Sequence, residues 1–203
     1  MMIQGVSIGE MLNQSMTVLT KPSVQSFEQF ERRGTQREGF IYVGAAAALA
    51  GIVGAVFGLL TGGIAGLIGG LVIGIVGPLL SYLVFSFLIY TIGKSQGGTG
   101  TQDEVFYTTS LYTAPILAVT GVVNAIPFLG CILLPATFIL GIYQLYLGYL
   151  ATRSSMNLDQ NKAILTVVLS IIAMWIAGAI LTFILAAIGL GAAAASGALN
   201  TAP

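Results

Sequence analysis

The chain has 203 residues, of which 56% are hydrophobic and only 7% are charged. Soluble domains carry about a quarter charged residues, so the composition excludes a soluble globular protein and indicates an integral membrane protein. Seven basic and seven acidic side chains balance and histidine is absent, so we expect no nucleic-acid partner, no metal site and no cofactor.

The first 38 residues are polar enough to stay outside the hydrocarbon. Ser7 and Glu10 have capping-box spacing and begin an amphipathic helix. A second short helix follows, with an apolar stripe that includes Phe27 and Phe30. One interpretation places this cytoplasmic segment on the membrane surface or against a partner protein. The other packs it onto the cytoplasmic face of the protein's own helices.

Residues 39–191 carry the apolar segments, and residues 192–203 form a small, uncharged tail. Because about 20 apolar residues cross a bilayer, the sequence predicts an all-α, polytopic membrane protein with five transmembrane helices. The expected spans are about 40–60, 64–92, 104–123, 128–152 and 163–190. Pro78, Pro115 and Pro135 lie inside the second, third and fourth spans.

A glycine repeat with four-residue spacing lies in the first two spans. Its members are Gly54, Gly58, Gly62, Gly66, Gly70 and Gly74. In lipid, helices associate through small residues that let their backbones approach closely. The sequence therefore predicts a helical hairpin that turns at residues 61–63. Its packing positions are Gly54 and Gly58 on the first helix and Gly66, Gly70 and Gly74 on the second.

The charged residues fix the expected orientation. With five spans, all seven basic residues fall in the N-terminal segment or in the loops at 93–103 and 153–162. The positive-inside rule makes that side cytoplasmic. We therefore expect a multi-pass protein of the cell membrane, with its N-terminus in the cytoplasm and its C-terminus outside.

Catalytic chemistry finds little support, because no carboxylate lies at membrane depth. Gly93-Lys94-Ser95 lacks the glycine that a Walker motif needs five positions earlier, where Leu88 stands. Adjacent Asp103 and Glu104 point about 100° apart on a helix, which favours capping over catalysis. The polar residues expected at depth are Ser81, Ser86, Thr137, Gln144, Thr166 and Thr182. We expect each to bond a neighbouring helix, and we expect no enzyme.

Tyrosines gather at one depth of the third and fourth spans. They are Tyr107, Tyr112, Tyr143, Tyr146 and Tyr149. One interpretation is an aromatic belt at the headgroup level. The other is a wet cytoplasmic groove or a seat for a partner protein.

The segment 97–150 resembles the Yip1-domain family. The resemblance lies in the Gly97-Gly98-Thr99-Gly100 turn, in a helix with Tyr112 and Pro115, and in the short proline-containing turn that follows at residues 124–127. The acidic Asp-Leu-Tyr-Gly-Pro motif of eukaryotic members is absent. That absence favours a bacterial member in the inner membrane.

The resemblance implies a five-span, non-enzymatic membrane protein. We expect a membrane-organising scaffold or an accessory subunit, with the lipid bilayer and other membrane proteins, or a second copy, as partners. The alternative is a small-solute or lipid transporter or channel, because three proline-interrupted spans can unwind around a substrate.

Overall fold

The computed structural model describes residues 5–200, which form an all-helical protein. Helix accounts for 85% of the structure, and no strand occurs among the described residues. The helices are α1 Ile8–Thr20, α2 Val24–Glu28, α3 Gln36–Ser95, α4 Gln102–Ala125, α5 Leu129–Ile132, α6 Leu134–Ser155 and α7 Gln160–Asn200. Within the described part, four are long and apolar enough to cross a membrane: α3, α4, α6 and the first part of α7, Gln160–Ile180.

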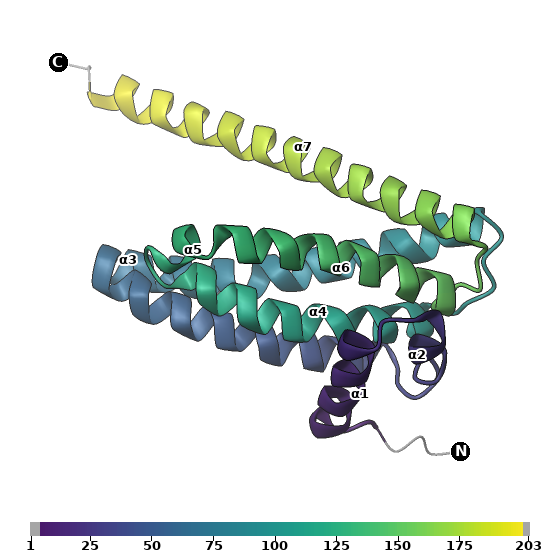
Figure 1. Ribbon diagram of the computed structural model, residues 1–203. Coiled ribbons are helices and arrows are strands. Elements are labelled where there is room, and N and C mark those ends of the chain that lie inside the picture. Colours follow the sequence, from purple (N-terminus) through teal and green to yellow (C-terminus); the bar gives the residue numbers. More distant parts are fainter. Residues whose placement is uncertain (1–4, 201–203) are drawn as a thin grey trace.

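α3 has 60 residues and folds back on itself. A straight helix of that length would extend about 90 Å, roughly three times the thickness of the hydrocarbon core. At Gly63 the backbone leaves the helical conformation, with φ 59° and ψ −146°, angles that glycine adopts without steric cost. This break lies in the expected turn. The first two expected spans are thus two arms of one bent helix (Figure 1).

The two arms of α3 pack backbone against backbone. The glycines in contact are Gly51 with Gly74, Gly54 with Gly70 and Gly58 with Gly66. A Cβ added to Gly66 would lie 2.0 Å from the carbonyl oxygen of Gly58, so only hydrogen fits there. All five expected packing positions therefore face the opposite arm. The contact also reaches Gly51, which lies outside the regular spacing of the sequence.

α4 is the central helix. Thr101 and Glu104 form its N-terminal capping box, and every side chain from residue 105 to residue 112 is buried. A helical segment that is buried all round, as this first half of α4 is, must be surrounded by other helices. Figure 1 shows α4 between the arms of α3, α6 and the N-terminal helices, while α7 diverges from the others towards its C-terminal end.

The connection from α4 to α6 differs from the expected fourth span. Phe128 has φ 67° in the left-handed region, and the short helix α5 follows it. Pro135 then occupies the first turn of α6, where proline is tolerated because no intrahelical donor is needed. Pro135 therefore begins a helix and does not interrupt one. At the other end, α7 continues to Asn200, into the stretch expected as a tail.

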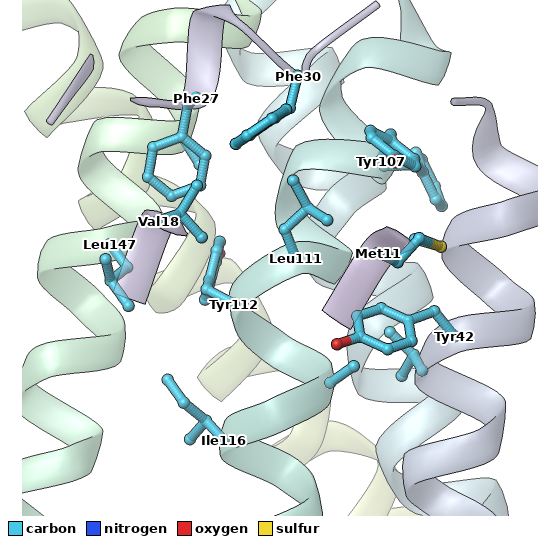
Figure 2. Packing of buried hydrophobic residues seen from close by; sticks show 14 of the residues in the cluster. Met11, Val18, Phe27, Phe30, Tyr42, Tyr107, Leu111, Tyr112, Ile116 and Leu147 are labelled. Carbon is cyan, nitrogen blue, oxygen red and sulfur yellow. The ribbon is translucent and has the colours of Figure 1, made fainter. Parts of the chain in front are cut away.

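The N-terminal helices are part of the core. Phe27 and Phe30 are buried with Tyr112 on α4 and Leu147 on α6, as Figure 2 shows. These two phenylalanines therefore pack onto the protein's own helices, as one of the two interpretations expected, and do not lie on the membrane surface. On α1, Met11 and Val18 are buried in the same cluster. The exposed stripe of α1 consists of Ile8, Leu12 and Met16.

Candidate functional site

The charged side chains gather at one end of the bundle. All seven basic and seven acidic residues fall within residues 10–38, 94–104 and 153–162, and these three segments meet in space (Figure 1). We call this part the polar end: the N-terminal segment 5–38 and the segments 94–104 and 153–162. The segregation leaves the rest of the described spans without a charged group.

Side-chain hydrogen bonds hold α1 against the long helices of the bundle. Tyr107 donates to the amide oxygen of Gln14 at 2.7 Å, and Ser15 shares a hydrogen bond with Tyr42 at 3.0 Å. Tyr143 donates to the backbone carbonyl of Leu19. Each bond joins α1 to a different spanning helix, so the N-terminal segment bridges α3, α4 and α6.

The tyrosines do not form one belt. Tyr107 and Tyr112 are buried in the core, whereas Tyr146 is 47% exposed and Tyr143 and Tyr149 are half-buried. The belt interpretation therefore fails for the two tyrosines of α4. Their burial arises because α1 and α2 cover the part of α4 that carries them.

Glu31 is a carboxylate buried under the polar end. It is 7% exposed and accepts a hydrogen bond of 2.7 Å from the hydroxyl of Ser154 on α6. Burial raises the pKa of Glu31 above its ordinary value, and the nearby Glu104 adds to the rise; the Ser154 bond and Arg32 oppose it. Arg32 also forms an ion pair with Glu104 at 3.1 Å. The connection between α2 and α3 is thereby tied to both α4 and α6.

The glycine turn is packed against the loop before α7. Gly97 has φ 89°, in the left-handed region. A Cβ added to Gly100 would lie 1.6 Å from the carbonyl oxygen of Ser155, and one added to Gly98 would lie 2.6 Å from Met156. Thr99 donates its backbone N–H to Met156 at 3.0 Å. The turn therefore joins the two loops of the polar end through backbone contacts that side chains would block.

A cavity of about 460 Å³ lies deeper, between the second arm of α3, α4, α6 and α7. Most of its wall is apolar, but seven residues with polar side chains line it: Ser81, Tyr82, Thr109, Tyr112, Thr113, Thr120 and Gln144. Two of them already donate to backbone carbonyls, Thr120 to Ile116 on its own helix and Tyr82 to Phe106 on α4. The volume lies in the range of about 300–1,000 Å³ that small-molecule sites have in proteins.

The cavity-facing hydroxyls differ from other hydroxyls in the spans. Thr108, Thr152 and Thr166 each donate to the carbonyl four residues earlier on their own helix, the usual way for a helix to satisfy such a group. The hydroxyl of Tyr112 instead lies beside the hydroxyls of Thr109 and Thr113 on the same helix. Together with Gln144 on α6 these groups form an uncharged polar cluster inside apolar walls.

A family model described as the Yip1 domain matches residues 16–193. The chain belongs to the Yip1 family. Yip1-domain proteins are polytopic membrane proteins, in agreement with the four candidate spanning helices, and the family is not known as enzymatic. Comparison with curated proteins gives no match, and neither does comparison with solved structures.

Within this Yip1 domain, the two parts of the family pattern lie in different places. Gly97, Gly98 and Gly100 lie at the polar end, whereas Tyr112 lines the cavity. Pro115 lies further along α4 and is not part of the cavity wall. The structure thus does not bring the pattern residues together into one site.

Sequence reasoning found only part of the cavity. Of the six polar residues expected at depth, Ser81 and Gln144 reach it, while Thr137, Thr166 and Thr182 bond their own helices and not a neighbouring one. Ser86 is buried without a partner. Thr109 and Thr113 were missed, although their four-residue spacing placed them on one face of α4.

Proposed function

We propose that this Yip1-family protein is a non-enzymatic scaffold or accessory subunit that organises other proteins of the membrane in which it lies. We propose that this membrane is the inner membrane of a bacterium. The observation that carries the proposal is an apolar face of α7 that the other described helices leave uncovered. Trp175 is 77% exposed and Phe183 is 76% exposed on this face. Together with Met174, Gly178, Ala179 and Thr182 they line a shallow groove.

The depth of Trp175 favours a protein partner over lipid. Trp175 lies 15 residues beyond the start of α7 at Gln160, or about 22 Å along the helix, inside the hydrocarbon layer. Tryptophan prefers the headgroup level, where its N–H finds a partner. Gly178 and Ala179 beside it are the small residues that allow two helices to approach closely. A helix of another membrane protein would bury the indole and use this small surface.

The proposed topology has five crossings, one for each arm of α3 and one each for α4, α6 and α7. It assigns residues 1–38 to a cytoplasmic segment, 39–191 to the transmembrane domain and 192–203 to a tail outside. The gathering of all basic residues at the polar end supports this orientation. A reporter fused after Pro203 is expected to be active outside the cytosol. Activity in the cytosol would contradict the topology.

Photocrosslinking in native membranes tests the scaffold. A benzophenone amino acid replaces Trp175, and a matched control carries it at Ile73 on α3, which is 75% exposed. We expect a discrete protein adduct from position 175 and none from position 73. Because the two side chains are almost equally exposed, a crosslink from position 175 alone would identify a partner bound at that face. Mass spectrometry of the adduct distinguishes another membrane protein from a second copy. Lipid adducts alone at position 175 would refute the proposal.

A further inference from the structure

The cavity between α3, α4, α6 and α7 has a cluster of uncharged polar groups in its wall. Thr109 is 3% exposed and Tyr112 is 2% exposed, and their hydroxyls lie beside each other on α4. The Tyr112 hydroxyl lies against Gly148 on α6, where an added Cβ would be 3.2 Å away. In a hydrocarbon environment polar groups are stabilised by hydrogen-bond partners. A bound molecule with acceptor oxygens would add such partners to this cluster.

The walls of the cavity restrict the head of such a molecule. None of its lining residues is charged, so a phosphate or carboxylate would be left without a counter-ion in a low-dielectric site. Gln144 lies 11 residues before the end of α6 at Ser155, or about 16 Å from that residue of the polar end. An uncharged head with hydroxyl or ester oxygens needs no counter-ion, and it can lie this far from the polar end.

The remaining walls suit an acyl chain. Val167, Ile171 and Met174 of α7 provide an apolar side opposite the polar groups. At the rim, Ser81 on α3 and Leu145 on α6 are exposed on the surface of the spans. A molecule can therefore enter from the bilayer without crossing the polar end.

From these observations we propose that the cavity binds a neutral lipid of the diacylglycerol class, with its hydroxyl and ester oxygens at Thr109, Tyr112 and Gln144 and an acyl chain along α7. This inference does not rest on the proposed scaffold role, because the cavity and the groove at Trp175 share only Met174.

The test uses the full chain in phosphatidylcholine nanodiscs with a photoactivatable diacylglycerol. We expect saturable labelling of the lining segments 109–120 and 141–148, displaced by unlabelled diacylglycerol. Gly141 lines the cavity and has no atom within 4 Å of an added Cβ, so Gly141→Leu fills the space without a backbone clash. Labelling is expected to fall at least about tenfold, equivalent to about 1.4 kcal/mol. The matched control, Gly178→Leu, lies on α7 beyond the cavity lining, has equally free space and should label as the wild type does.

A second variant separates head recognition from filling of the cavity. The side chain of Gln144 makes no hydrogen bond to the residues that the structure describes, so Gln144→Leu should leave thermal stability unchanged or slightly raised, while it lowers diacylglycerol labelling several-fold. Equal labelling of wild type, Gly141→Leu and Gln144→Leu would overturn the proposal. A photoactivatable phosphatidylglycerol that labels the same segments as strongly would overturn it too, because the site would then not select a neutral head.

Discussion

Replacing Gly66 by alanine is expected to lower the free energy of unfolding by about 3 kcal/mol, or roughly 10 °C in Tm. A Cβ at residue 66 would lie 2.0 Å from the carbonyl oxygen of Gly58 and 2.7 Å from its carbonyl carbon. Both are backbone atoms, so no side chain can turn away and the arms of α3 must separate. Thermal unfolding of the purified chain in mild detergent measures the change.

Gly69→Ala is the matched control. Gly69 lies three residues further along the same arm, and an added Cβ there meets no atom within 4 Å. Alanine has the higher helix propensity by up to about 1 kcal/mol, so this variant should be as stable as the wild type or more stable. The two substitutions are chemically identical and should act in opposite directions. If Gly66→Ala and Gly69→Ala shifted Tm equally, the close approach of the arms would be refuted.

Glu31 is expected to make stability depend on pH. Burial raises the pKa of Glu31, so the folded protein holds this proton more tightly than the unfolded chain does. Its contribution to stability is therefore complete below the ordinary pKa of a glutamate and is lost as pH rises through the raised value. In Glu31→Gln the side chain stays neutral, and its carbonyl oxygen can still accept from Ser154. The Tm of this variant relative to wild type should increase from about pH 4 to about pH 8.

Glu31→Ala is the contrasting variant, because it removes the acceptor as well as the charge. The buried hydroxyl of Ser154, which is 1% exposed, then has no carboxylate to bond, at a cost of about 1–3 kcal/mol. We expect the alanine variant to be less stable than the glutamine variant at every pH in the series. A constant difference in Tm between wild type and Glu31→Gln across the series would show that the carboxyl group titrates as it does in water.

Local signals in the sequence predicted much of the fold. The capping box at Ser7–Glu10 forms as expected, and Glu104 caps its helix as expected, together with Thr101, because a cap depends only on residues three apart. The break at Gly63 falls in the expected turn for a similar reason. Pro135 shows the limit of such reasoning. Proline is compatible with either a kink or a helix start, and the preceding left-handed Phe128 decides between them.

The candidate cavity depends on contacts between segments far apart in the chain. Gln144 and Tyr112 were singled out from the sequence, yet nothing local indicates that α3, α4, α6 and α7 leave a space between them. The same holds for Phe27 and Phe30, whose apolar stripe suits a membrane surface as well as a protein core. Only the position of α2 over α4 and α6 buries them.

By itself the sequence determined the membrane character, the all-helical class and the grouping of charges, because the cost of placing ions and unpaired backbone groups in hydrocarbon depends on composition and order alone. Tertiary structure decided which side chains are satisfied. Thr108 and Thr109 are neighbours of similar chemistry, but Thr108 bonds its own helix and Thr109 faces the cavity. The difference arises from how the helices pack, since hydrogen bonding and burial depend on which surfaces meet.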